Sequence, residues 1–172
     1  RSRGLGDVYK RQVLSIAALE PLDWEKIRLA ISPERNIELN ISCPNLDTHE
    51  DTTSFEGFDK FPGHMRNKWC IVKIPPTASE KLVDKIVDCG YNTIHASNTL
   101  PTELGGLSGK VLVPYTTRLI QYIKSKHPHV QIIAGGGVKN KSDAEQYLEA
   151  GADHISLGTV CFTPWKVKSI LK

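Results

Sequence analysis

The rest of the chain is built around the segment Glu38-Leu-Asn-Ile-Ser-Cys-Pro-Asn45. Polar and apolar residues alternate over its first four positions, as in a short β-strand, and the proline ends the strand because it has no N–H to donate. Asn40, Ser42, Cys43 and Asn45 are therefore crowded at one strand end. Amides there can hold a planar, hydrogen-bonding ligand, and a thiol can exchange a proton with it. The alternative is an ordinary strand-to-loop turn, since Ser, Pro and Asn are turn formers.

The composition is that of a globular protein with room for a real core: 172 residues, 40% hydrophobic and 24% charged. A net charge of +3, spread along the chain, does not indicate nucleic-acid binding. Because there is no apolar run of roughly 20 residues and no signal-peptide pattern, we expect no membrane span and a cytoplasmic protein. The cysteines lack metal-site spacing, so we expect no metal and no disulfide, with Cys70, Cys89 and Cys161 packed as small apolar residues.

Strands and helices alternate along the rest of the chain. Residues 1–12 are rich in Arg and Gly without an apolar period, which predicts a disordered or non-native lead-in, so the domain is expected to occupy residues 13–172. The predicted strands are residues 13–19, 38–45, 70–74, 93–96, 131–134 and 154–157. The predicted helices are residues 21–30, 79–89, 115–126, 142–151 and 164–171, and residues 46–68 and 98–110 are predicted loops.

Apolar strands that alternate with helices indicate an α/β fold with a parallel sheet. The unusual residues follow strand ends, which form the catalytic face of a (β/α)8 TIM barrel. An open doubly wound sheet shows the same alternation. We favour the barrel because no GxGxxG follows the first strand, while glycine-rich turns follow the last two strands, where barrels commonly bind phosphate.

Two glycine turns are candidate anion sites. Gly135-Gly136-Gly137 and Gly158-Thr159 let backbone N–H groups approach an anion without a Cβ in the way, although a lone glycine run is equally typical of a simple turn. Ser142 and Glu145 match a capping box at the start of the helix that follows the first turn.

A charged residue interrupts one predicted strand. Lys73 lies in the apolar strand of residues 70–74, where a charge is costly unless it has a partner. Its alternatives are an exposed edge strand and a barrel mouth in which the lysine neutralises an anionic ligand, and we favour the second.

Histidines are scattered through the chain. We interpret His95 as a satisfied strand histidine rather than a ligand, and His127 and His129 as solvated at the opposite end of the strands. No catalytic triad or carboxylate pair can be placed on the active face, which argues against hydrolase chemistry.

Taken in order, the motifs resemble those of dihydroorotate dehydrogenases from about Val13 to the C-terminus. The matching motifs are Asn40–Asn45 (NISCPN), Val72–Pro75 (VKIP), Asn98-Thr99, Gly105–Gly109 (GGLSG), Gly136-Gly137 and Gly158-Thr159. The resemblance implies an FMN-dependent (β/α)8 barrel that oxidises dihydroorotate to orotate in pyrimidine biosynthesis, with a possible homo-oligomeric assembly.

The resemblance also implies roles for individual residues. Cys43 matches the base that removes the C5 proton while hydride leaves C6 for flavin N5, and Lys73 matches the residue that stabilises the reduced, anionic flavin. The implied substrate-binding residues are Asn40, Asn45, Asn98 and Thr99. The implied residues for the ribityl chain and phosphate are Ser108, Gly109, Gly136, Gly137, Gly158 and Thr159.

The sequence departs from the family pattern in two places, and its class within the family is mixed. Residues 13–19 match the third barrel strand, so a fragment of about six β/α units that binds FMN weakly is expected. The loop at residues 46–68 lacks the usual lid pattern. Cys43 is similar to the soluble class, whereas residues 103–110 are closer to quinone-linked enzymes, so fumarate, NAD and quinone all stay open as electron acceptors.

Two further functions stay open. One is a related flavin barrel that acts on another dihydropyrimidine, against which Asn45 argues because that family has histidine at the matching place. The other is a phosphate- or flavin-binding pseudo-enzyme barrel without turnover, against which the joint presence of Cys43 and Lys73 argues.

Overall fold

A computed structural model of the chain describes residues 12–20, 22–41, 57–64, 69–103 and 105–171. The expected lead-in at residues 1–11 lies outside the described residues, as do Ser42, Cys43 and Asn45.

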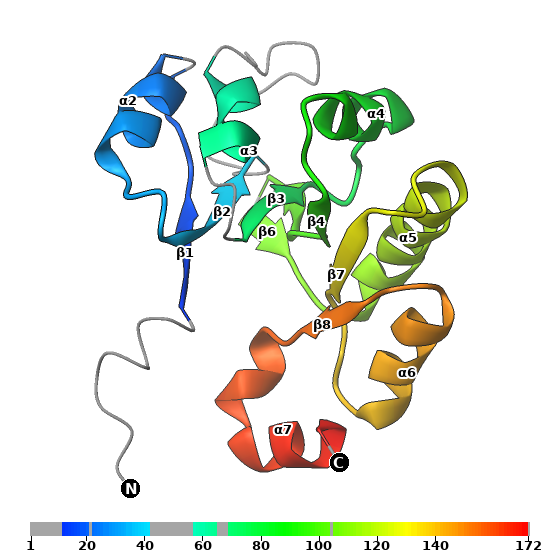
Figure 1. The fold of residues 1–172 in the computed structure, drawn as a ribbon. Helices are drawn as coiled ribbons and strands as arrows, with labels where there is room; N and C mark the ends of the chain where they lie inside the picture. The colour runs from blue at the N-terminus through cyan, green and yellow to red at the C-terminus, as the bar shows by residue number, and fades with distance from the viewer. Residues whose placement is uncertain (1–11, 21, 42–56, 65–68, 104, 172) are drawn as a thin grey trace, which may run out of the picture.

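Six parallel strands form one curled sheet in the order β1-β2-β3-β4-β7-β8 (Figure 1). The strands are β1 (Val13–Ile16), β2 (Asn36–Asn40), β3 (Cys70–Ile74), β4 (Thr93–Ala96), β7 (Gln131–Gly135) and β8 (His154–Ser156). Their spatial order follows the order of the chain without reversal, whereas a doubly wound sheet reverses direction at a switch point. The predicted parallel sheet is therefore confirmed, and its topology is that of a barrel rather than of an open doubly wound sheet.

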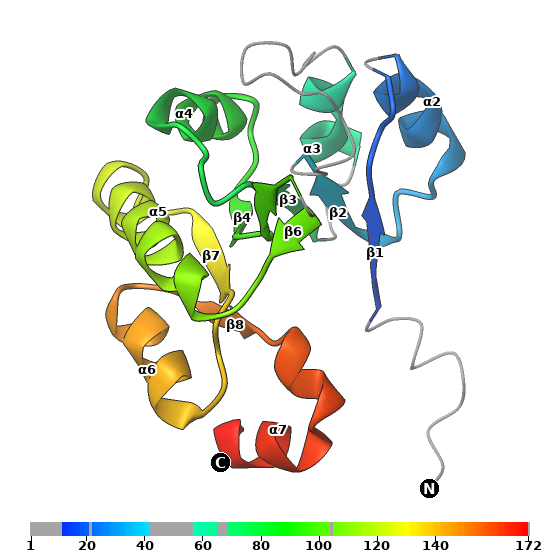
Figure 2. The same ribbon diagram turned by 180° about the vertical axis from the view of Figure 1, so that it is seen from behind.

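Helices lie on the outer side of this sheet in both views (Figures 1 and 2). They are α2 (Asp23–Ala30), α3 (Phe61–His64), α4 (Glu80–Asp88), α5 (Val113–Lys126), α6 (Lys141–Glu149) and α7 (Pro164–Ile170), with 3-10 helices at Phe58–Lys60, Lys110–Leu112 and Thr159–Phe162. Within the described part of the chain, no helix has the length and apolar character needed to cross a membrane.

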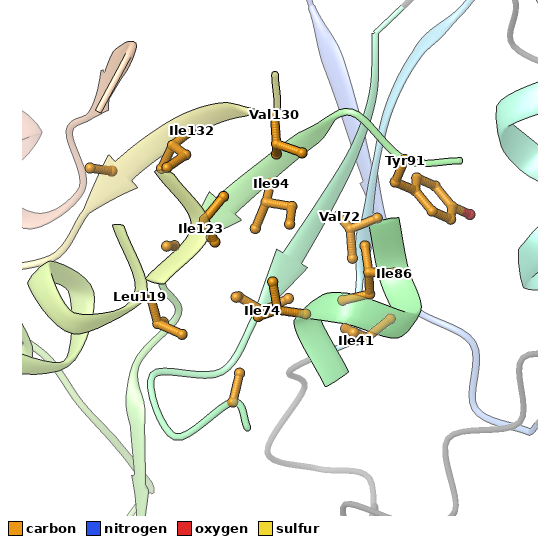
Figure 3. Packing of buried hydrophobic residues seen from close by; sticks show 14 of the residues in the cluster. Ile41, Val72, Ile74, Ile86, Tyr91, Ile94, Leu119, Ile123, Val130 and Ile132 are labelled. Atoms are coloured by element: carbon orange, nitrogen blue, oxygen red, sulfur yellow. The ribbon is translucent and has the colours of Figure 1, made fainter. Parts of the chain in front are cut away.

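The core lies between the outer face of the sheet and these helices (Figure 3). Val72 and Ile74 of β3 alternate with Lys73, and Ile94 of β4 precedes His95, so the apolar side chains of both strands share the helix-facing side. Burying each such side chain contributes about 1.5–3 kcal/mol. The same alternation turns Lys73 and His95 to the inner face of the curled sheet.

Two predicted loops contain regular structure. Residues 98–110 include the antiparallel hairpin of β5 (Leu100–Thr102) and β6 (Gly105–Leu107). The segment was predicted as a loop because it is rich in glycine. Residues 58–64, within the predicted loop of residues 46–68, form a short 3-10 helix and α3. Aromatic packing holds the two short helices in place, because the centroid of the Phe58 ring lies 5.5 Å from that of Trp24 and 4.8 Å from that of Tyr91.

The predicted capping box at Ser142 is wrong. The N-cap of α6 is Asn140, whose Oδ1 accepts a hydrogen bond from the Asp143 N–H at 3.0 Å. Asp143 in turn accepts from the Lys139 N–H at 2.9 Å, so a reciprocal cap forms two residues before the predicted one.

Two other side-chain predictions need correction. His127 is not solvated, because its Nε2 lies 2.7 Å from Asp84 Oδ1 and its side chain is mostly buried. Cys70 and Cys89 are half-buried as predicted, and burial raises the pKa of the Cys70 thiol to about 12. Cys161 is exposed instead, since it lies in the short 3-10 helix after β8.

Candidate functional site

A cavity of about 520 Å³ opens at the carboxyl ends of the strands. All residues predicted to bind the cofactor line it, namely Lys73, Ser108, Gly109, Gly136, Gly137, Gly158 and Thr159. Asn98 and Thr99, which follow β4, also line it. Because the carboxyl ends of parallel strands meet at one edge of a sheet, residues that lie far apart in the sequence converge here.

Asn40, Lys73 and His95 occupy one level across three neighbouring strands. The register pairs Asn40 of β2 with Lys73 of β3, and Lys73 with His95 of β4. Just beyond β4, the Asn98 side-chain Nδ2 lies 3.5 Å from Asn40 Oδ1. The structure therefore brings together the two predicted substrate-binding amides that it describes, next to the predicted catalytic lysine. Cys43 and Asn45 follow β2 in the sequence and lie outside the described residues.

Glu38 is the centre of a polar network that the sequence analysis missed. Its carboxylate accepts a hydrogen bond from Ser15 Oγ at 2.9 Å and lies 2.7 Å from His95 Nδ1. Lys73 Nζ lies 4.0 Å from the same carboxylate. The available signal was the presence of two polar residues, Glu38 and His95, at inward positions of two strands that flank the strand of Lys73.

The network sets the ionisation of Glu38. Burial alone would raise the pKa of this carboxyl, but the contact with His95, the hydrogen bond from Ser15 and the charge of Lys73 together lower it below its ordinary value. Glu38 is therefore a carboxylate at neutral pH, and it supplies the counter-charge that a lysine in an apolar strand requires.

Glu38 should make the fold sensitive to acid. Because the pKa of the folded-state carboxyl lies below the ordinary 4.5, its stabilisation is fully present above pH 4.5 and is lost as the pH falls through the folded-state pKa. Glu38→Gln should cost about 1.5–3 kcal/mol at pH 7, the usual range for hydrogen bonds to charged groups, and much less in acid. Urea unfolding at several pH values measures this difference. Glu149→Gln, at the exposed end of α6, is the control, and an equal pH dependence in both variants would contradict the assignment.

The glycine turn after β7 is held in a conformation that only glycine adopts readily. Gly136 and Gly137 have φ of 96° and 79°. The Tyr147 hydroxyl donates a hydrogen bond to the Gly136 carbonyl at 2.7 Å, and Thr116 donates to the Gly135 carbonyl at 3.1 Å. Side chains of α5 and α6 therefore hold the backbone of this cavity wall in place.

Two glycines of the cavity should respond differently to substitution. A Cβ on Gly136 would lie 2.8 Å from the Leu112 side chain, whereas a Cβ on Gly158 would meet nothing within 4 Å. Gly136→Ala should cost at least the roughly 1–2 kcal/mol of a left-handed residue, or about 5 °C in melting temperature. Gly158→Ala should leave the melting temperature nearly unchanged. Thermal unfolding of the two variants checks the prediction, and equal losses would contradict it.

Two lysines add positive charge to the glycine-lined side of the cavity. Lys139 and Lys166 both line it, and they come from the segments that follow β7 and β8. Neither lysine could be singled out from the sequence, which does not show which of many surface lysines turn toward a cavity. Glycine backbone together with two ammonium groups is a combination suited to a phosphate group.

Comparisons with known proteins identify the family of the chain. A family model described as dihydroorotate dehydrogenase matches residues 24–172. The chain is 30% identical over 142 residues to the catalytic subunit of dihydroorotate dehydrogenase B (NAD+) of Thermotoga petrophila, which covers 73% of this chain and 53% of that protein. It is 33% identical over 119 residues to a dihydroorotate dehydrogenase (quinone) of Dichelobacter nodosus, which covers 59% of this chain and 35% of that protein.

A solved structure shows the same fold. The Eimeria tenella DHODH in complex with ferulenol superposes with a TM-score of 0.70 at 18% identity, over 86% of this chain and 52% of that one. The chain spans about half the length of the curated relatives it matches, with 53% for the Thermotoga protein and 56% for the Bacillus pumilus protein.

Proposed function

The chain belongs to the dihydroorotate dehydrogenase family, and from this premise we propose that its cavity binds FMN and serves the oxidation of dihydroorotate to orotate in pyrimidine biosynthesis. The observation that carries the proposal is the meeting of Asn40, Lys73 and Asn98 at the carboxyl ends of β2, β3 and β4, beside a cavity that the glycine turns also line. The site thus combines amides and a cation with glycine backbone suited to an anion.

The residues present fit FMN. The cavity volume of about 520 Å³ lies within the range of roughly 300–1,000 Å³ that is usual for small-ligand sites. An added Cβ on Gly109 or Gly158 would meet no atom within 4 Å, so the backbone at both positions faces open space. Lys139 and Lys166 offset the charge of a phosphate monoester, which is about −1.5 to −2 at neutral pH.

The chain's own residues have distinct tasks in this proposal. When bound, FMN supplies the hydride acceptor. Lys73 lines the cavity and would hold an ammonium near a bound flavin ring, and preorganised charge of this kind lowers a barrier at which negative charge develops. Asn40 and Asn98 offer both amide donors and acceptors to a pyrimidine ring. Cys43 is proposed, from the resemblance, to take the proton from C5.

The test is anaerobic reduction of the flavin. The chain is mixed with FMN, and dihydroorotate is added without oxygen while the flavin absorbance is followed and orotate is assayed. Bleaching with stoichiometric orotate supports the proposal. Bound FMN that no dihydropyrimidine bleaches would favour the pseudo-enzyme, and faster bleaching by dihydrouracil than by dihydroorotate would favour the related flavin barrel. Adding fumarate, NAD+ or a quinone afterwards identifies the electron acceptor.

A further inference from the structure

Only one of the two ring nitrogens of His95 makes a hydrogen bond with the described residues. The residue is 8% exposed, and its Nδ1 lies 2.7 Å from Glu38 Oε2. Its Nε2 makes no hydrogen bond with any described residue, although His95 lines the cavity. A ring nitrogen that reaches a cavity and has no partner among these residues is available to a ligand or to water.

The wall opposite Nε2 is kept open by a glycine. A Cβ on Gly135 would lie 3.3 Å from His95 Nε2 and 3.1 Å from the Ser156 side chain. Any other residue at position 135 would therefore crowd the imidazole edge that faces the cavity.

Glu38 determines which ring nitrogen of His95 carries the proton. A carboxylate only accepts hydrogen bonds, so the proton at this contact belongs to His95 Nδ1. Lys73 also supplies a positive charge to Glu38, with its Nζ 4.0 Å from the carboxylate. In a neutral imidazole with its proton on Nδ1, Nε2 is a hydrogen-bond acceptor.

We propose that His95 Nε2 accepts a hydrogen bond from the imide N–H of a bound flavin ring, and that Glu38 positions His95 for this contact. The inference rests on the proposed function. An imide N–H is flanked by carbonyls, and the cavity offers a matching acceptor at His95 beside a donor at Lys73, on adjacent strands in register. A pyrimidine substrate carries the same group, so the experiment must separate the two sources.

The first measurement needs no ligand. In the chain labelled with 15N-histidine, the His95 ring should show the tautomer with the proton on Nδ1, which is the minor form of free neutral imidazole. Glu38→Gln should move the population toward the Nε2–H form. A wild-type His95 that carries its proton on Nε2 would overturn the positioning role of Glu38.

The second measurement follows the His95 Nε2 resonance and the backbone amides of Gly136 and Gly137 during titration to millimolar concentrations of FMN, of N3-methyl-FMN and of orotate. FMN should shift Nε2, N3-methyl-FMN should not, and orotate alone should not. The methyl group should weaken binding about five- to tenfold, the size of one neutral hydrogen bond. His95→Leu should weaken FMN binding by a similar factor and should bind both flavins equally.

The outcomes separate this inference from the proposed function. If FMN shifts the Gly136 and Gly137 amides but not Nε2, the flavin binds and the His95 contact is wrong. If orotate alone shifts Nε2, the imide comes from the substrate and the flavin contact is wrong. If FMN shifts none of these resonances, the cavity does not take flavin and both proposals fall. The comparison of the two flavins uses the wild-type chain, so it stands even if His95→Leu does not fold.

Discussion

Cys43→Ala is expected to slow reduction of the bound flavin by dihydroorotate by about 10²–10⁴-fold, the usual contribution of a general base. The residue lies outside the described part of the chain, and its role is proposed from the motif at residues 40–45. A thiol is a poor base until it ionises, and the ordinary cysteine pKa is about 8.5. The rate of flavin reduction by the wild-type protein should therefore rise with pH along one ionisation, whereas FMN and orotate binding should survive the substitution.

The measurement is the anaerobic bleaching rate against pH, with two further variants for comparison. Cys43→Ser should keep a little activity and require more alkaline conditions, because the pKa of a hydroxyl is much higher than that of a thiol. Cys89→Ala is the matched control, since that cysteine lies at the end of α4 and not among the residues that line the cavity. If Cys43→Ala bleaches as fast as the wild type, another group takes the proton.

Local patterns predicted the strands and the cavity wall well. The apolar run of residues 70–74, which is followed by two prolines, became β3 with the predicted limits, and residues 93–96 became β4. The inward position of Lys73 was also predictable, because a charge in an apolar strand needs a polar side to face. The glycine turns followed from residue type alone, since few other residues adopt the φ of Gly136 and Gly137.

Contacts between distant residues could not be predicted in the same way. Glu38 and His95 are 57 residues apart, and only the register of β2, β3 and β4 brings them together. His95 was interpreted as a strand histidine whose hydrogen bonds are satisfied within the protein. This is correct for Nδ1, which contacts Glu38, but it does not account for Nε2. The α6 cap shows a related failure, because Ser142 and Asn140 offer competing caps and only the backbone geometry selects Asn140.

Lys73→Ala is expected to slow flavin reduction by about 10²-fold while it weakens FMN binding much less. A bound flavin would gain negative charge only as it is reduced, so an ammonium near it would act on the transition state more than on the oxidised complex. Removing one preorganised charge or donor of this kind typically costs about 2.7–4 kcal/mol, and each 1.36 kcal/mol is a factor of ten in rate. Stopped-flow reduction by saturating dihydroorotate gives the rate, and fluorescence quenching gives the FMN dissociation constant.

Lys139→Ala is expected to weaken FMN binding without slowing flavin reduction, which is the opposite of the effect expected for Lys73→Ala. Lys139 lines the glycine side of the cavity, where it would meet the phosphate, whereas Lys73 lies in β3 beside Glu38. A phosphate contact is equally strong before and after hydride transfer, so its loss should raise the FMN dissociation constant and leave the reduction rate of the loaded protein unchanged. The two lysines should thus affect different constants. If Lys73→Ala instead weakens FMN binding and reduces at the wild-type rate once loaded, Lys73 only holds the cofactor, and the charge that develops during oxidation is stabilised elsewhere.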